Sequence, residues 1–180
     1  ARKRFELAEK HLKKAIALDP GFTDARNNLA RVLIEQKKFP EAEEQMKKVM
    51  ADLTYGALDK AYFNRGLLSF EQGRWAEAEK GFRLSIDAQR DNCYATTYLG
   101  RTFFERKNYD QASEIFDRAI GLCKKIFYDE PHYYSALTYY RMGQREKSQA
   151  RFEEIIRNYP DGKYLEKSRS MLKLFKGKDI

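Results

Sequence analysis

Residues 62–70 read YFNRGLLSF, and residues 96–104 read TTYLGRTFF. Aligning the two stretches places Gly66 opposite Gly100, 34 residues further along the chain. The same spacing continues downstream in four more pairs: Gly73 and Lys107, Trp75 and Tyr109, Ala78 and Ala112, and Phe82 and Phe116. A fixed period of this length indicates a repeat architecture, in which each repeat is one supersecondary unit stacked on the next.

The composition indicates that these units are helical. The chain has only 10 Gly and 4 Pro in 180 residues, and its apolar residues recur three and four positions apart. With 42% hydrophobic and 14% aromatic residues it can bury a continuous core, which excludes intrinsic disorder. The pattern argues against a β-sandwich or a parallel-sheet enzyme, and no stretch approaches the roughly 18 consecutive apolar residues of a membrane-spanning helix.

Each unit is predicted to contain two helices. The first helix carries a small residue that lets its neighbour approach closely, and this residue is Ala30, Gly66, Gly100 or Ala136. The second helix carries a small residue followed four positions later by a bulky one on the same face. The small residue is Ala42, Ala78, Ala112 or Ser148. Pro40 falls in the first turn of a second helix, where its missing N–H is harmless, and Asp129 is predicted to cap the helix that follows it.

These placements resemble the tetratricopeptide repeat, whose 34-residue period they match over about residues 4–160. The resemblance implies an all-α, right-handed tetratricopeptide-repeat superhelix of antiparallel helix hairpins with a C-terminal capping helix. We expect a single domain over residues 1–180, which opens inside a repeat, so that a leading helix precedes this chain. Its predicted parts are a partial repeat at 4–20, repeats at about 23–56, 59–92, 93–126 and 129–162, and a capping helix at about 163–175.

The residues give no sign of catalysis. His11 and His132 are the only histidines, and the chain has no Cys-x-x-Cys pair, no glycine-rich phosphate loop and no Gly-x-Ser-x-Gly motif. His132 lies close to Asp129 and Glu130 in the sequence and could be a weak metal ligand, but a histidine in the first turn of a repeat more often packs or faces solvent. We therefore predict no catalytic residue, no metal site and no cofactor.

The charge pattern argues against nucleic acid as a partner. The chain has 35 basic and 27 acidic residues, a formal net charge of +8. Its lysine pairs are interleaved with glutamates, so they read as solvated helix faces and not as one electrostatic stripe.

Cys93 and Cys123 open and close the hairpin predicted at 93–123. Because antiparallel helices bring those two ends together, a disulfide is geometrically feasible if the Cα atoms lie within about 7 Å. The alternative is two buried free thiols. A disulfide would indicate an oxidising compartment such as a periplasm.

The predicted binding site is the concave side of the array, which the first helices line. Taking positions i, i+3, i+7 and i+10 of these helices gives a partner-binding groove of Asn27, Arg31, Ile34, Lys60, Phe63, Leu67, Phe70, Tyr94, Thr97, Arg101, Phe104, Tyr133, Leu137 and Tyr140. Exposed aromatic residues on this scale mark a partner site, and Arg31 and Arg101 are expected to orient the ligand. The alternative is that the next helix covers some of these rings.

Four further stretches narrow the resemblance: the linker DLTYG at 52–56, FNRGL at 63–67, the weak final repeat SALTYYRMG at 135–143, and the ending NYP at 158–160. Together with the cysteine pair, they resemble the type IV pilus pilotin family (PilF, PilW and Tgl). The groove lacks the Lys/Asn arrangement with which chaperone-binding tetratricopeptide domains grip a carboxylate.

The pilotin resemblance implies a non-enzymatic lipoprotein on the periplasmic face of the bacterial outer membrane. Such a protein binds PilQ secretin subunits, promotes their assembly, and touches the membrane only through a lipid anchor, which is expected outside this chain. The competing reading is a general tetratricopeptide scaffold, in the periplasm for envelope assembly or in the cytosol.

Overall fold

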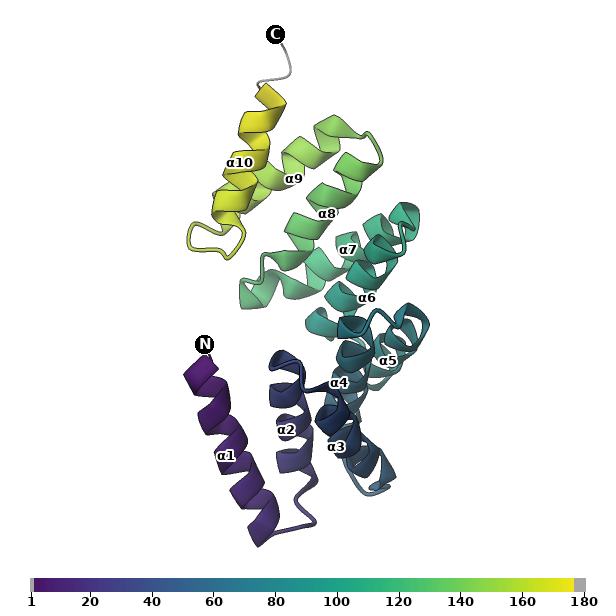
Figure 1. Ribbon diagram of the computed structural model, residues 1–180. Helices are drawn as coiled ribbons and strands as arrows, with labels where there is room; N and C mark the ends of the chain where they lie inside the picture. Colours follow the sequence, from purple (N-terminus) through teal and green to yellow (C-terminus); the bar gives the residue numbers. More distant parts are fainter. Residues whose placement is uncertain (1, 177–180) are drawn as a thin grey trace. The chain divides into compact units, whose positions relative to one another are not determined.

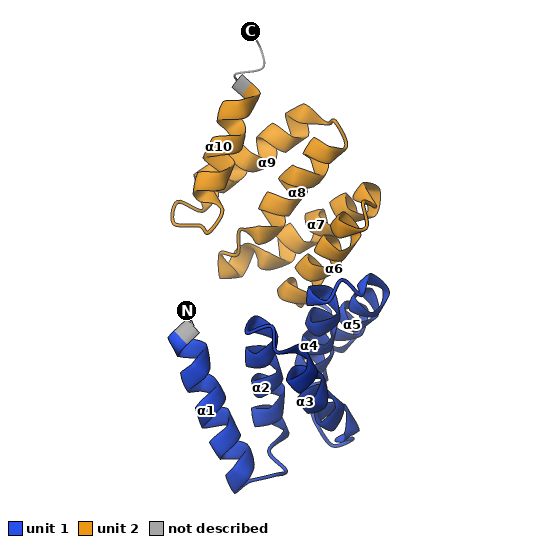
Figure 2. Ribbon diagram, viewed as in Figure 1, with its two compact units in different colours: residues 1–90 blue, residues 91–180 orange. Residues whose placement is uncertain are grey.

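The computed structural model describes residues 2–176, which form α-helices joined by short connections (Figure 1). The all-α fold of paired helices predicted from the sequence is confirmed. The chain consists of two compact units, residues 1–90 and 91–180 (Figure 2). The single domain expected over residues 1–180 stays a prediction. Among residues 2–176, no helix combines the length and apolar character needed to cross a bilayer.

Unit 1 contains one single helix followed by two hairpins. Its helices are α1 Arg2–Leu18, α2 Thr23–Glu35, α3 Phe39–Ala51, α4 Leu58–Glu71 and α5 Trp75–Ala88. Helix α1 packs on α2, and α4 packs both on its own partner α5 and on the two helices of the preceding hairpin. Each repeat thus buries its apolar face against its neighbour, as a repeat protein requires.

Unit 2 repeats this arrangement and ends in a further helix. Its helices are α6 Cys93–Glu105, α7 Tyr109–Cys123, the 3-10 helix η1 Lys124–Ile126, α8 Glu130–Arg141, α9 Arg145–Asn158 and α10 Leu165–Lys176. Helix α8 contacts both α6 and α7, and α10 packs on α9. Phe175 of α10 joins a buried cluster with Ala136, Phe152 and Ile155, so α10 covers the apolar face of the last hairpin.

Close contact between a small and a bulky residue recurs in the hairpins. A Cβ atom on Gly66 would lie 2.8 Å from the ring of Phe82, and one on Gly100 would lie 2.7 Å from the ring of Phe116. The first hairpin and the last have an alanine and a bulky side chain at the corresponding positions, and all four residues are buried: Ala30, Met46, Ala136 and Phe152. The 34-residue spacing found in the sequence therefore corresponds to the recurrence of this packing contact from one hairpin to the next.

The turns inside the hairpins also repeat. The second residue after each first helix has a left-handed backbone, and this residue is Lys37, Gly73, Lys107 or Gly143. At the third of these turns the N–H of Lys107 bonds the carbonyl of Phe104 at 2.9 Å, and the next N–H bonds the carbonyl of Phe103 at 2.9 Å. This pair of bonds is the Schellman motif, which satisfies the last carbonyls of a helix and reverses the chain.

Asp129 does not cap its own helix as predicted, because its side chain makes no capping hydrogen bond to α8. One carboxylate oxygen instead accepts a hydrogen bond from the backbone N–H of Tyr164, at 2.8 Å. Asp129 therefore fixes the segment that leads into α10, a contact 35 residues away that local sequence could not indicate.

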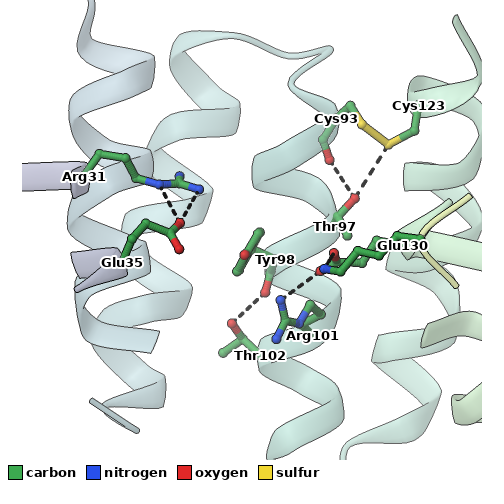
Figure 3. A network of polar contacts seen from close by, with 10 residues as sticks. Arg31, Glu35, Cys93, Thr97, Tyr98, Arg101, Thr102, Cys123 and Glu130 are labelled. Carbon is green, nitrogen blue, oxygen red and sulfur yellow. Dashed lines mark hydrogen bonds and ion pairs between the residues drawn. A yellow bond between two sulfur atoms is a disulfide. The ribbon is translucent and has the colours of Figure 1, made fainter. Parts of the chain in front are cut away.

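The structure joins Cys93 and Cys123 by a disulfide with a Cα–Cα distance of 5.1 Å. Thr97 donates a hydrogen bond to the carbonyl of Cys93 at 2.8 Å and lies 3.6 Å from the sulfur of Cys123 (Figure 3). The bond ties the start of α6 to the end of α7 and so closes the open end of that hairpin.

Replacing Gly81 tests the close approach of α4 and α5. A Cβ atom there would lie 2.5 Å from the backbone Cα of Gly66, which cannot move without separating the two helices. We expect Gly81→Ala to lower the free energy of unfolding by about 1–3 kcal/mol, measured by urea titration with circular dichroism. Gly121→Ala is the matched control, because a Cβ at this helical glycine meets nothing within 4 Å and should be neutral or stabilising. Equal effects of the two changes would refute the packing argument.

Removing the disulfide tests what it contributes. The Cys93→Ala and Cys123→Ala double variant should lose about 3–4 kcal/mol of unfolding free energy, because the bond closes a loop of 30 residues in the unfolded chain. Urea titration with and without dithiothreitol measures this: the reductant should shift the wild-type midpoint and leave that of the variant unchanged. A wild-type midpoint that ignores the reductant would contradict the expectation.

Candidate partner-binding surface

Five of the residues predicted to line the groove have buried side chains, namely Asn27, Ile34, Leu67, Phe70 and Thr97. The structure therefore places them in the core, which corrects the sequence prediction. For four of them the physical reason lies in the helical period: positions three and ten residues along a helix are rotated by about 60 and 80° from the starting residue. On α2 and α4 this rotation turns Ile34 and Phe70 towards the helices packed against them. Leu67 lies seven positions along and is rotated by only about 20°, so its burial reflects the helices packed around α4.

Asn27 belongs to a buried polar network in unit 1. The side-chain amide of Asn64 donates to its Oδ1 at 2.8 Å, and its own amide donates to the hydroxyl of Tyr55 at 3.2 Å. The Tyr55 hydroxyl donates in turn to Asp24 at 2.7 Å. Burial, followed by the bond to Asp24, raises the pKa of Tyr55 to about 12, so this hydroxyl stays protonated as a donor. The network joins α2, the α3–α4 linker and α4.

In unit 1 the accessible part of the prediction is a small patch formed by Arg31, Lys60 and Phe63, which we call the unit 1 patch. The guanidinium of Arg31 lies 5.3 Å from the ring centroid of Phe63, close enough for a cation–π contact between α2 and α4. Arg31 also pairs with Glu35 at 3.0 Å, one turn along the same helix (Figure 3). Lys60 is exposed one turn before Phe63, so the patch offers two cations beside a half-buried aromatic ring.

Arg101, the second arginine expected to orient a ligand, is already engaged inside unit 2. Its Nη1 lies 2.8 Å from the buried carboxylate of Glu130 (Figure 3). Its guanidinium carbon lies 4.7 Å from the ring centroids of both Tyr98 and Tyr134. Arg101 on α6 therefore links this helix to Glu130 on α8. Because removing one partner from such a buried pair is strongly destabilising, we assign Arg101 a structural role.

The remaining predicted residues of unit 2 are partly exposed aromatic and aliphatic side chains: Tyr94, Phe104, Tyr133, Leu137 and Tyr140. Tyr133 stacks on Tyr164 with centroids 4.2 Å apart, and Tyr140 stacks on Phe175 at 5.8 Å. The alternative that neighbouring elements cover some of the predicted rings therefore holds for Tyr133 and Tyr140. The segment before α10 packs on the first ring, and α10 packs on the second. Phe104 makes edge contacts with Tyr109 and Tyr134.

Two features escaped the sequence reasoning. Tyr98 and Tyr134 lie one position after predicted residues, where the helix turns by about 100°. A hollow of about 500 Å³ also lies among α3, α4 and α5, with Met46, Met50 and Leu68 in its lining and charged side chains of both signs around them. No predicted groove residue lines it. The apolar residues that line this hollow on the second helix α3 look in the sequence like ordinary core residues. The hollow could therefore not be predicted from them.

His132 is buried and packs against Tyr159, whose hydroxyl lies 3.4 Å from its Nδ1. Its Nε2 lies 3.8 Å from a carboxylate oxygen of Glu154. Within the described part of the chain, no group of three or more His, Cys, Asp or Glu side chains could hold a metal ion. Burial lowers the pKa of His132, an effect opposed by the nearby carboxylate of Glu154. His132 is therefore a packing residue, which is one of the two alternatives to metal binding that the sequence left open.

We therefore expect the His132 ring to titrate below the usual histidine pKa of about 6.5. In the unfolded chain this ring takes up a proton near that pH while the folded chain holds it neutral, so its contribution destabilises the fold as the pH falls below 6.5. Histidine ring NMR spectra, assigned with a His132→Gln variant, measure the midpoint. A midpoint at or above 6.5 would show that the pairing with Glu154 outweighs burial.

Three models of the tetratricopeptide repeat match the chain, over residues 1–54, 63–125 and 132–162. These spans follow the helices of both units. The chain therefore belongs to the tetratricopeptide repeat family, whose stacked helices serve as scaffolds for protein interactions.

More particularly, the chain is similar to proteins of the type IV pilus. The type IV pilus assembly protein PilF of Pseudomonas aeruginosa is 25% identical over 112 residues, which are 62% of this chain and 44% of that protein. The solved structure of PilW, a widely conserved type IV pilus biogenesis factor, matches with a TM-score of 0.77 at 20% identity, covering 88% of this chain and 72% of that one.

A thermophilic tetratricopeptide protein of Thermus thermophilus matches similarly, with a TM-score of 0.76 at 17% identity over 89% of this chain and 86% of that one. At such identities the solved structures show the shared fold alone. The matched part of this chain spans less than half the length of the curated relatives.

Proposed function

We propose that this chain is the protein-binding part of a type IV pilus pilotin, which binds PilQ secretin subunits and promotes their assembly at the outer membrane. The observation that carries the proposal is the unit 1 patch, where Arg31 and Lys60 flank the ring of Phe63 on two first helices. The chain acts by binding alone, without catalysis.

The unit 1 patch suits a peptide segment that carries carbonyl or carboxylate groups beside an apolar side chain. A cation and an aromatic ring held together by packing lose little freedom on binding, which favours them as binding anchors. With Arg101 engaged by Glu130, Arg31 takes the orienting role, and Lys60 adds a second cation one turn from Phe63.

Two further observations support the pilus assignment. The similarity to PilF extends over most of this chain, and PilF is a type IV pilus assembly protein. The disulfide between Cys93 and Cys123 suits an oxidising compartment, so we place the protein at the periplasmic face of the outer membrane. A general scaffold for other envelope partners would share the fold and differ in the segment bound.

Charge reversal in the unit 1 patch tests this function. The Arg31→Glu and Lys60→Glu double variant should weaken binding of purified PilQ by about 30-fold or more, since hot-spot side chains contribute about 2 kcal/mol or more. Biolayer interferometry on protein shown to be folded by circular dichroism measures the change.

The matched control is Lys14→Glu with Lys80→Glu, which alters the net charge equally at exposed positions on α1 and α5. This control should bind PilQ nearly as the wild type does. If the folded patch variant binds PilQ like the control, the patch is not the binding site. If the wild-type chain does not bind PilQ at all, the pilotin assignment fails as well.

A further inference from the structure

The connection between α7 and α8 presents apolar side chains to solvent. We call its residues 124–127 the α7–α8 tip. Phe127 is 79% exposed and Ile126 is 48% exposed, and Tyr94 at the start of α6 is 50% exposed. Gly100 and Ala136 lie 36 residues apart, as Ala30 and Gly66 do, whereas Gly66 and Gly100 lie 34 apart. The α3–α4 and α7–α8 connections therefore each contain two more residues than the connection between α5 and α6. Two large apolar side chains exposed side by side in one short connection call for an explanation beyond packing of the repeat.

The α7–α8 tip is anchored to the buried part of unit 2. The disulfide between Cys93 and Cys123 lies immediately before it, in a buried cluster with Ala119 against which Tyr128 packs. The ring of Tyr128 meets that of Tyr94 at 5.0 Å. Phe127 itself has a φ of 51°, in the left-handed region that aromatic residues rarely adopt. The disulfide and the contacts of Tyr128 thus anchor the chain on both sides of the α7–α8 tip, while the Phe127 side chain is exposed.

The charge around the α7–α8 tip is positive. From Arg118 to Tyr128 the chain has three basic residues and no acidic one, and Lys124 and Lys125 are both exposed. The acidic residues that follow are buried and engaged, Asp129 by the N–H of Tyr164 and Glu130 by Arg101. Exposed lysines beside exposed apolar side chains call for a partner that is anionic at its surface and apolar beneath.

We propose that the α7–α8 tip docks on the surface of an anionic phospholipid bilayer. Phe127 and Ile126 enter the boundary between headgroups and acyl chains, and the ammonium groups of Lys124 and Lys125 meet the lipid phosphates. The exposed ring of Phe127 needs a partner that can accommodate it, and the fluid surface of a bilayer does so without a preformed cavity. An acidic protein partner would need a hollow matched to Phe127, which makes it the less favoured occupant.

Vesicle co-sedimentation tests the proposal. Vesicles of phosphatidylcholine with 30 mol% phosphatidylglycerol should bind the wild-type chain, whereas vesicles of phosphatidylcholine alone should bind it at least about tenfold more weakly. The Ile126→Ser and Phe127→Ser double variant should bind the anionic vesicles about tenfold more weakly, because it loses the inserted apolar surface. Lys124→Gln and Lys125→Gln should each weaken binding about fivefold.

Matched controls separate the tip from general attraction by the net charge. Leu18→Ser with Leu53→Ser removes two exposed apolar side chains elsewhere, and Lys14→Gln with Lys80→Gln removes two exposed charges elsewhere. Both should bind anionic vesicles within about twofold of the wild type. If the tip variants bind like these controls, or if neutral vesicles bind equally well, the proposal is wrong.

The same variants distinguish this proposal from the secretin proposal and from a protein partner. The Arg31→Glu and Lys60→Glu variant should bind PilQ about 30-fold or more weakly, while tip variants should bind PilQ as the wild type does. If the Ile126→Ser and Phe127→Ser variant instead loses PilQ and the wild type shows no preference for anionic vesicles, the α7–α8 tip is a protein-docking surface and the membrane proposal is overturned.

Discussion

The structure depends on the contact between a small residue on the first helix of each hairpin and a bulky residue on the second. At Gly66 and Gly100 even one methyl group would overlap a buried phenylalanine ring. This contact sets the distance between the two helices, and a constant distance lets hairpins of the same shape stack on one another. The left-handed residue two positions after each first helix complements this contact, because it reverses the chain so that the second helix begins two residues later.

The same packing determines which side chains remain available for binding. Within each unit, a first helix such as α4 or α8 packs against its own partner and against the preceding hairpin, so only a narrow stripe of it remains accessible. In unit 1 this stripe includes Arg31, Lys60 and Phe63, whereas their neighbours Asn27 and Leu67 are buried. In unit 2 the corresponding stripe is covered further, because α10 and the segment before it stack on Tyr133 and Tyr140.

The two departures from the regular spacing carry features that the repeat itself does not need. In the α3–α4 linker, Tyr55 closes a network of hydrogen bonds with Asp24 and Asn27. In the α7–α8 connection the added length presents Phe127 to solvent beside the disulfide. Residues that interrupt a repeat are released from its packing constraint, so they are free to acquire separate interactions.

The helical class, the hairpins and the small residues that set their spacing could be predicted from the sequence alone, because they follow from local periodicity and from a repeat that can be aligned with itself. The sequence also placed Cys93 and Cys123 at one end of a hairpin, since the ends of antiparallel helices meet. Three features became visible only in the folded chain: Asp129 holds the segment before α10, Glu130 engages Arg101, and Ile34 and Phe70 turn into the core. The reason is that burial and ion pairing depend on neighbours about 30 residues away or on a second helix, and the angle at which that helix packs is not encoded in the period of the first.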